Sequence, residues 1–421
     1  MTTAPQDTIA TIQWTTSPAN GTPLVHEARW HCERGSAAPK KVVLADDTMN
    51  ADQAYRLACE GTALMWRGDF QNARQLLQAL ARRLDKTAEK TARQSSEQRG
   101  AAAKAAAKAL AANAGTPVDP ALHFHRHRQV QAQRARVLSM LLVEMDAKYL
   151  LTLRRAPNVQ EACTQAWGAG KGNMSNVVSL RELQGLIGAF EWRKKGVEIV
   201  ALLALRPTGY AHIHPHYGVY SPVRGEYIDL VAQAPLPAAL NKQSLAFDIG
   251  TGTGVLAAVL ARRGVKQVVG TDTDERALAC AKDNLPRLGV DQQVKLQKAD
   301  LFPEGRAALL LCNPPWLPAK ASAPVERAVY DEGSRMLQGF LQGAAAHLLP
   351  GGEAWLILSD LAEHLGLRSR EQLMAWINSA GLRVLERHDI RPRHPKAQDE
   401  SNPLHRARAA EVTSLWRLAA V

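Results

Sequence analysis

Cysteine is scarce in this chain, and its placement excludes two classes of small protein. Five cysteines occur among 421 residues, and none of them forms a C-x-x-C pair or another spacing typical of zinc ligands. Disulfide-stapled scaffolds and zinc ribbons are therefore excluded, and we expect reduced thiols. The five are Cys32, Cys59, Cys163, Cys280 and Cys312.

Long apolar runs are lacking as well. No stretch approaches the roughly 18 consecutive apolar residues of a membrane-spanning helix, and residues 1–7 lack the charged and then apolar pattern of a secretory signal. Hydrophobic residues nevertheless make up 46% of the chain, which is ample for buried cores. We expect a soluble cytoplasmic protein of two or three domains with no membrane partner.

Acidic residues are too few in the first half of the chain to balance its basic ones. Residues 1–210 contribute +10 of the formal net charge of +12, and residues 211–421 contribute +2. Residues 71–140 alone hold thirteen Lys and Arg against four Asp and Glu. Such a segment beside a nearly neutral half is typical of a module that faces a polyanion, so we expect RNA or the ribosome as its partner. A solvated helical face that happens to be basic would give the same pattern.

Helical periodicity dominates this basic segment. Leucines at 76, 77, 80 and 84 lie within roughly 100° of one another on a helix, with basic residues opposite. The alanine-rich run at 101–110 favours a helix, and a second basic helix is expected from about Pro120. Only residues 42–44 suggest a strand, so residues 1–205 are predicted to form a mostly helical domain that recognises the substrate. The basic residues are Arg82, Arg83, Lys86, Lys90 and Arg93 on the first helix and Arg126, Arg128, Arg134 and Arg136 on the second.

Two groups of three histidines alternate along the chain. On a strand, alternation would place three imidazoles on one face, which is a possible metal site. No carboxylate or cysteine lies nearby in the sequence to complete either ligand set, so we expect no metal. The second group is expected to line the entrance of the C-terminal domain or to pack in its lid. The groups are His123, His125 and His127, and His212, His214 and His216.

A glycine-rich turn begins the informative part of the sequence. The run L-A-F-D-I-G-T-G-T-G-V-L-A from Leu245 predicts a strand, a tight turn and the start of a helix. The glycines permit positive φ and close approach of a ligand, and the helix start offers free N–H groups. The spacing differs from the G-x-G-x-x-G of dinucleotide sites, so the turn alone is a weak signal. The loop contains Gly250, Thr251, Gly252 and Gly254.

Short apolar runs alternate with helical segments from residue 245 onward. This alternation predicts a doubly wound parallel α/β sheet, and two final strands without a helix between them predict a hairpin with one antiparallel member. We therefore expect a seven-stranded domain at 206–421. The expected strands are 245–249, 267–271, 293–297, 307–311, 354–358, 382–389 and 412–417, and the expected helices are 255–263, 275–288, 334–349 and 370–380.

Polar side chains end four consecutive predicted strands, where ligands of such sheets bind. Asp248 lies just before the glycine loop, and Asp272 at the end of the second strand could accept from both hydroxyls of a ribose. Asp300 ends the third strand and could accept from an adenine amino group, and residues 313–316 end the fourth. One such aspartate could be an ordinary turn residue, but four polar strand ends in register indicate a site for a nucleoside-bearing cofactor.

From about Tyr217 to its end, the sequence resembles the class I S-adenosylmethionine-dependent methyltransferases of the small-domain group, whose fourth strand ends in N-P-P-Y or a variant. The resemblance includes the L-P-G-G run at 349–352. It implies S-adenosylmethionine as cofactor, with its methionine end held by Asp248 and the loop at 250–254. It also implies that Asp272 binds the ribose and that Asp300 lies by the adenine. Trp316 departs from the Tyr or Phe that is most frequent in the group.

The N-P-P-W sequence suits methylation of a planar nitrogen. The resemblance implies that Asn313 and the Pro314 carbonyl receive a target –NH2, whose delocalised lone pair makes it a poor nucleophile. Two acceptors aimed at its hydrogens would favour a pyramidal nitrogen with a free lone pair. Pro314 and Pro315 restrict the loop, and Trp316 would hold the planar group by stacking. Transfer then depends largely on in-line positioning.

A segment just upstream bears on the identity of the acceptor. It contains P-x-R-x-E with Arg224 and Glu226, and is similar to the segment before the first strand in release-factor glutamine methyltransferases. The long basic N-terminal region instead favours RNA. We therefore expect an N-methyltransferase acting on an RNA base, first of all of ribosomal RNA. The alternatives are a glutamine of a translation factor or ribosomal protein and, more remotely, a non-catalytic RNA-binding protein.

Overall fold

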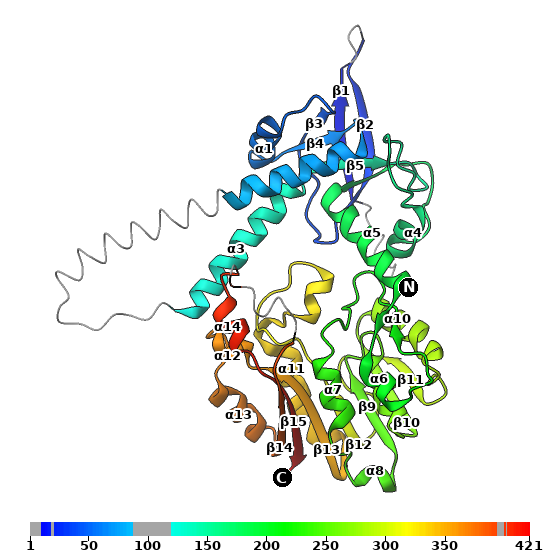
Figure 1. Ribbon diagram of the computed structural model, residues 1–421, viewed down its shortest axis with the longest axis vertical. Coiled ribbons are helices and arrows are strands. Elements are labelled where there is room, and N and C mark those ends of the chain that lie inside the picture. The colour runs from blue at the N-terminus through cyan, green and yellow to red at the C-terminus, as the bar shows by residue number, and fades with distance from the viewer. Residues whose placement is uncertain (1–9, 18–20, 87–118, 394–399, 401) are drawn as a thin grey trace, which may run out of the picture. The chain divides into compact units, whose positions relative to one another are not determined.

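The chain consists of two compact units, Met1–Gly188 and Ala189–Val421, which we call unit 1 and unit 2. The computed structural model (Figure 1) describes residues 10–17, 21–86, 119–393, 400 and 402–421. The sequence placed the division later, at residue 205. It lies earlier because residues 197–205 belong to the core of unit 2, where Val197, Ile199 and Leu202 are buried in one cluster with the helix α9 (Val255–Arg262).

Unit 1 is built around a six-stranded mixed sheet in the order β1-β2-β6-β5-β4-β3. Its strands β3, β4 and β5 run parallel to one another, and β6 is antiparallel to β5 and parallel to β2. The first two strands form an antiparallel pair. The strands are β1 (Thr11–Thr16), β2 (Leu24–His31), β3 (Lys41–Ala45), β4 (Thr62–Trp66), β5 (Leu141–Met145) and β6 (Asn176–Ser179).

The two basic helices predicted around the leucines and from Pro120 are present in the described residues, but the prediction of a mostly helical region omitted the sheet. Leu76, Leu77 and Leu80 form the buried face of the helix at 70–86, as expected. The strands were missed because they are short, and β4 is buried at every position, so its pattern does not differ from that of a buried helix segment. The helices are α1 (Ala51–Cys59), residues 70–86, α3 (Pro120–Leu138), α4 (Gln160–Trp167) and α5 (Leu180–Lys195), which continues past Gly188.

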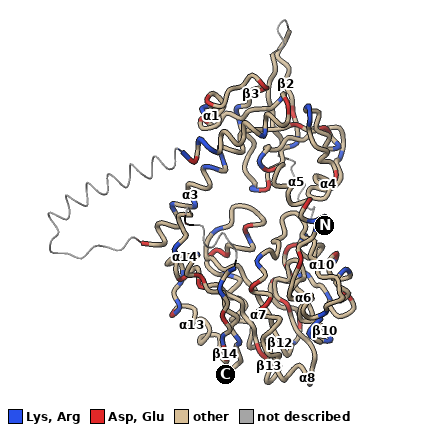
Figure 2. The backbone as a smooth tube through the Cα atoms, in the orientation of Figure 1, with Lys and Arg blue, Asp and Glu red and all other residues tan. Residues whose placement is uncertain are grey.

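The basic face of unit 1 is partly neutralised by acidic partners. Arg83 pairs with Asp52 at 2.8 Å, and Arg134 pairs with Asp85 at 2.9 Å. Other basic side chains along these helices are exposed, and Figure 2 shows where Lys and Arg lie along the backbone. RNA binding by residues 71–140 therefore stays a prediction. The exposed ones among the predicted set are Arg82, Lys86, Arg126 and Arg136, whereas Lys90, Arg93 and the alanine-rich run lie outside the described residues.

Unit 2 contains a seven-stranded sheet in the order β11-β10-β9-β12-β13-β15-β14. The strands from β11 to β13 are parallel, and β15 is antiparallel to both of its neighbours, so the predicted doubly wound sheet with one antiparallel member is confirmed. The strands are β9 (Leu245–Ile249), β10 (Gln267–Asp272), β11 (Val294–Lys298), β12 (Ala307–Cys312), β13 (Leu348–Ser359), β14 (Leu382–Ile390) and β15 (Thr413–Ala420).

Helices cover both faces of this sheet, because successive strand residues point to opposite faces. Ala246 packs in one cluster with α7 and α9, whereas its neighbour Phe247 packs in another cluster with α11 and α13. Every residue of β12 is buried, as in a parallel strand covered on both sides. The helices are α6 (Val200–Leu205), α7 (Glu226–Gln233), α8 (Ala239–Lys242), α9, α10 (Glu275–Arg287), α11 (Arg335–His347), α12 (Leu361–His364), α13 (Arg370–Ser379) and α14 (His405–Ala410), with the 3-10 helices η1 (Pro324–Ala328) and η2 (Glu332–Ser334) and a small β7 (Val197–Glu198) and β8 (His212–Ile213) pair.

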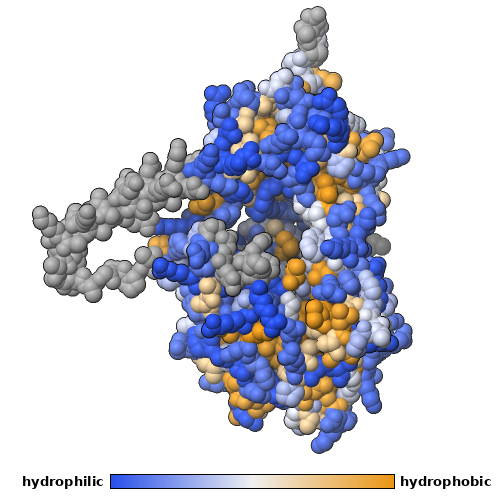
Figure 3. Space-filling model, viewed as in Figure 1, coloured by the Kyte–Doolittle hydropathy of each residue, from blue (hydrophilic) through white to orange (hydrophobic). Residues whose placement is uncertain are grey.

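Hydrophilic residues cover most of the face drawn in Figure 3, with hydrophobic patches between them. Within the described ranges, no helix combines the length and the apolar character that a membrane crossing requires. Localisation in the cytoplasm stays a prediction.

Candidate active site

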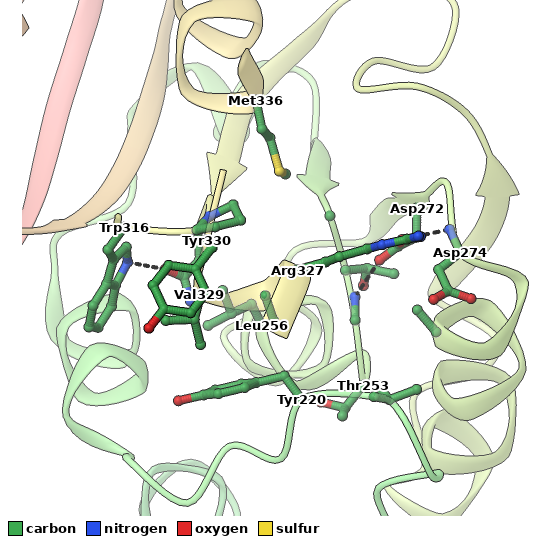
Figure 4. Close-up of a pocket in the computed structure, with 18 of the residues that line it drawn as sticks. Tyr220, Thr253, Leu256, Asp272, Asp274, Trp316, Arg327, Val329, Tyr330 and Met336 are labelled. Carbon is green, nitrogen blue, oxygen red and sulfur yellow. Dashed lines mark hydrogen bonds between the residues drawn. The ribbon is translucent and has the colours of Figure 1, made fainter. Parts of the chain in front are cut away.

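A cavity of about 730 Å³ lies at the carboxyl ends of the central strands of unit 2. The glycine loop follows β9, Asp272 ends β10 and Asn313 follows β12, so the sheet brings these distant segments to one edge. In Figure 4, Trp316 lies on one side of the cavity and Asp272 and Asp274 lie on the other. The predicted site residues that line it are Arg224, Gly250, Thr251, Gly252, Asp272, Asp300, Asn313, Pro315 and Trp316.

The glycine loop needs its glycines for backbone conformation. Gly250 has a φ of +74° and Gly254 a φ of +80°, which residues with side chains rarely adopt. A Cβ on Gly254 would lie 3.2 Å from Cβ of Ala281, so this glycine also permits close packing of α9 against α10. Gly250 and Gly252 line the cavity, whereas Gly254 is the N-cap of α9.

Asp248 lies beneath the loop and does not line the cavity. It is 1% exposed, and its Oδ2 accepts from the Thr251 hydroxyl at 2.7 Å and from the Ala257 amide at 3.1 Å. These bonds tie the loop to the first turn of α9. The resemblance implied direct contact with the cofactor, but the geometry makes Asp248 a residue that positions the loop. Burial raises its pKa to about 6.

Replacement of Asp248 by asparagine is expected to remove a pH dependence of stability. The pKa of Asp248 in the folded state, about 6, exceeds the ordinary value of about 3.9. The contribution of this group to the free energy of unfolding is therefore fully present below about pH 4 and is lost as the pH rises through 6. The loss amounts to roughly 3 kcal/mol. Calorimetric melting at pH 4.5 and 7.5 should show the variant gaining stability relative to the unmodified protein at the higher pH. A difference that stays constant with pH would contradict this assignment.

Asp272 is aimed into the cavity by backbone groups. Its carboxylate accepts from the Gly252 amide at 3.1 Å and from the Asp274 amide at 2.9 Å, and burial raises its pKa. Asp300 also lines the cavity, but it is more exposed and pairs with Arg335 at 3.2 Å. The two carboxylates thus stand where the sequence placed them, and the Arg335 partner was not foreseen.

The indole of Trp316 has a contact that the sequence did not suggest. Its Nε1–H donates to Oδ1 of Asn313 at 2.9 Å (Figure 4). Because a carboxamide oxygen has two lone pairs, one stays available for an incoming N–H group. The bond also fixes which end of the Asn313 amide is the oxygen. Pro315 lines the cavity, whereas Pro314 is buried and does not line it.

Replacing Trp316 with phenylalanine should therefore lower turnover about 2- to 10-fold, the effect of one lost hydrogen bond of roughly 0.5–1.5 kcal/mol. The ring remains available for stacking, so the KM for the acceptor should change less than kcat. Steady-state kinetics with the methyl-accepting substrate would measure the changes in kcat and in KM separately. Trp376 on α13 does not line the cavity, and its change to phenylalanine serves as the control. Unaltered kcat would show that the indole N–H does not matter.

A loop after Trp316 supplies cavity residues that the sequence analysis missed. The Leu317 amide donates to the Val329 carbonyl and the Asp331 amide donates to the Leu317 carbonyl, which pins the two ends of the loop together. The carboxylate of Asp331 accepts from the first amides of α11, and burial raises its pKa. Arg327 extends from η1 across the cavity (Figure 4). The loop has no hydrophobic periodicity, so no signal in the sequence could have placed Arg327 or Tyr330 there.

Arg224 and Glu226 belong to one sequence segment, but only the first of them lines the cavity. Arg224 lines the cavity, and its Nη2 lies 3.4 Å from a carboxylate oxygen of Glu411, which also lines it. Glu226 does not line the cavity; its carboxylate accepts from the Arg393 amide at 2.6 Å. Tyr220, Trp192 and Arg408 complete this part of the wall. Of these, only Tyr220 lay in a segment that the sequence had singled out.

The histidine groups do not contribute to the cavity. His214 is buried, with its amide donating to Oδ1 of Asn284, and His216 Nε2 lies 2.8 Å from Oδ2 of Asp283. His214 and His216 therefore pack against α10 and do not line the cavity; whether the group lies at the entrance or in a lid stays a prediction. Burial lowers the pKa of His216. Among the described residues, no cluster of three or more His, Cys, Asp or Glu could hold a metal.

Residues 211–374 match a family model described as methyltransferase small domain. This segment contains the glycine loop, Asp272 and the N-P-P-W sequence, together with the strands β9 to β13 of the sheet. The segment is thus similar to the methyltransferase small domain. This likeness agrees with the predicted resemblance, and the sheet order confirms the predicted fold.

Proteins similar to this segment include enzymes named for protein methylation. A release factor glutamine methyltransferase of Cereibacter sphaeroides is 32% identical over 150 residues, which is 32% of this chain and 51% of the relative. A candidate protein N5-glutamine methyltransferase of Methanocaldococcus jannaschii is 29% identical over 157 residues, 35% of this chain and 75% of the relative. A ribosomal protein L11 methyltransferase of Marinobacter nauticus is 30% identical over 138 residues, which is 32% of this chain and 43% of the relative. The chain thus spans about half the length of the first relative.

Proposed function

We propose that this protein is an S-adenosylmethionine-dependent N-methyltransferase that methylates a planar amino or amide nitrogen of a macromolecule, with an RNA base as the acceptor. The observation that carries the proposal is the shared cavity of the glycine loop and Asn313. A methyl donor on the loop and a nitrogen at the Asn313 carboxamide would lie within one enclosure. Enzymes of this kind gain much of their rate from such positioning.

The residues of the loop fit the proposed cofactor, which would supply the methyl group. Gly250 and Gly252 leave the loop backbone open to close approach, where a Cβ on Gly250 would meet Met336 Cε at 2.6 Å. The Asp272 carboxylate can accept from both hydroxyls of a ribose. Asp300 also lines the cavity and would accept a hydrogen bond from the adenine amino group. In the structure it pairs with Arg335.

Asn313 would prepare the acceptor nitrogen. Its Oδ1 holds the Trp316 N–H on one lone pair and can accept an N–H of the target on the other. With the Pro314 carbonyl as a second acceptor, the target nitrogen would be drawn toward a pyramidal geometry with its lone pair free for the methyl group. The Trp316 ring would hold the planar acceptor by stacking.

The alternative acceptor is the amide of a protein glutamine. The names of the relatives and the P-x-R-x-E segment with Arg224 favour it. The basic segment of unit 1 favours RNA, because Lys and Arg that neutralise phosphates dominate binding to nucleic acids.

One experiment tests the function and separates these acceptors. The purified full chain is incubated with methyl-labelled S-adenosylmethionine and, in parallel, with total RNA and total protein from cells that lack the gene. We expect label in RNA. Label confined to protein would mean that the acceptor is a glutamine and not an RNA base. Label in neither fraction would contradict the methyltransferase proposal itself.

A further inference from the structure

The charged groups of the cavity are segregated between two sets of strand ends. The ends of β9, β10 and β11 bring three carboxylates, those of Asp272, Asp274 and Asp300, and two guanidinium groups, that of Arg335 from α11 and that of Arg327 from η1, lie on the same side (Figure 4). Beyond Asn313, the ends of β13 and β15 bring the opposite balance. Here two guanidinium groups, those of Arg224 and Arg408, face one carboxylate, that of Glu411. We call this second set the acceptor half.

Glu411 balances the charge of Arg224 within the acceptor half. The glutamate is 1% exposed, accepts from the Ser359 hydroxyl at 2.8 Å and lies 3.4 Å from the Arg224 guanidinium. Ser359 ends β13, and Glu411 lies just before β15, so the pair is built from adjacent strand ends. Each oxygen of the carboxylate thus has a partner, and the other guanidinium of the acceptor half is that of Arg408.

Arg408 lines the cavity from α14 without a carboxylate partner. Across the described chain it forms no ion pair, and its Nε is buried without a hydrogen-bond acceptor. Leaving a guanidinium donor desolvated and unsatisfied is costly unless a ligand supplies the acceptor. Arg406, two residues earlier on the same helix, is exposed and does not line the cavity.

We propose that Arg408, with Arg224 beside Glu411, binds a phosphate of the nucleic-acid strand next to the target base. This inference rests on the proposed function and extends it to a subsite. A guanidinium presents paired donors that match two phosphate oxygens, and phosphate contacts set the position of a strand while other groups read the base. An uncharged peptide segment around a glutamine would bring no anion to this side of the cavity.

Binding of mononucleotides tests the subsite directly. The full chain, saturated with S-adenosylhomocysteine, is titrated by calorimetry with AMP, GMP, CMP and UMP and with the matching nucleosides. We expect the preferred nucleotide to bind at least roughly tenfold more tightly than its nucleoside, as one charge-assisted contact would give. Arg408→Gln should reduce this ratio to about twofold, whereas Arg406→Gln should leave it unchanged.

Two further measurements separate the outcomes. The unmodified protein, Arg408→Gln and Arg406→Gln should bind S-adenosylhomocysteine with equal affinity, which would show that the domain is folded in all three. On a short RNA, Arg408→Gln should flatten the dependence of log K on log salt by about 0.7, the value for one phosphate contact on a single strand. An unchanged slope and an unchanged nucleotide ratio would overturn the subsite even if RNA is methylated.

A glutamine acceptor would give a different set of results. A capped glutamine peptide would then be methylated equally well by the unmodified protein and by Arg408→Gln, and no nucleotide would bind better than its nucleoside. That result would overturn the subsite while the methyltransferase proposal stands. If the unmodified protein methylates neither RNA nor peptide, this result would instead contradict the proposed function.

Discussion

Replacement of Asn313 by alanine is expected to lower turnover by roughly 10²- to 10³-fold without changing affinity for S-adenosylmethionine. The size is that of losing one preorganised partner that acts on the reacting group. The variant removes the acceptor for the target N–H and at the same time leaves the Trp316 indole N–H without its present partner. Single-turnover kinetics would measure the methyl-transfer step, and calorimetry would measure cofactor affinity.

The control for this variant is Asn378→Ala. Asn378 is exposed on α13 and does not line the cavity, so turnover should stay normal. Near-normal turnover of the Asn313 variant would remove the N-P-P-W sequence from the chemistry. A loss of cofactor affinity would instead mean that Asn313 supports the glycine loop rather than the acceptor.

Replacement of Asp272 by alanine should act on the opposite side of the cavity. Affinity for S-adenosylmethionine is expected to fall about 5- to 150-fold, or roughly 1–3 kcal/mol, because charge-assisted bonds to the ribose are lost. The Gly252 amide also loses its acceptor, which loosens the loop. Titration calorimetry measures this change, and Asp291→Ala, at an exposed position outside the cavity, is the control.

The two variants should differ at saturating cofactor. Asp272→Ala should then recover most of its turnover, since its defect is in binding, whereas Asn313→Ala should not. Equal affinity of Asp272→Ala and the unmodified protein for the cofactor would show that the second strand end does not hold the ribose.

Most of unit 2 could be predicted because its signals are local. The predicted strand at 245–249 coincides with β9, and the other six strand predictions overlap the observed strands. Parallel strands that are covered on both faces are continuous apolar runs, and turn residues and helices separate them. Such patterns need no knowledge of distant residues. The carboxyl ends of the strands then fix where Asp272 and Asn313 must meet.

Residues whose roles depend on distant partners could not be assigned in this way. Asp248 was expected at the cofactor, but Thr251 and Ala257 hold its carboxylate under the loop. Trp316 was expected as a platform, and its N–H also holds Asn313. In both cases the residue type and its spacing were informative, but the direction of the side chain depends on packing.

The sequence by itself thus determined the sheet of unit 2, its glycine loop and the polar strand ends, because chain order and hydrophobic pattern dictate how parallel strands align. Tertiary structure alone decided the sheet of unit 1, where short buried strands carry no distinct period. It also decided the acceptor half of the cavity, since Arg224 lies far along the chain from Arg408 and Glu411. Their charge balance exists only once β13 and β15 lie side by side.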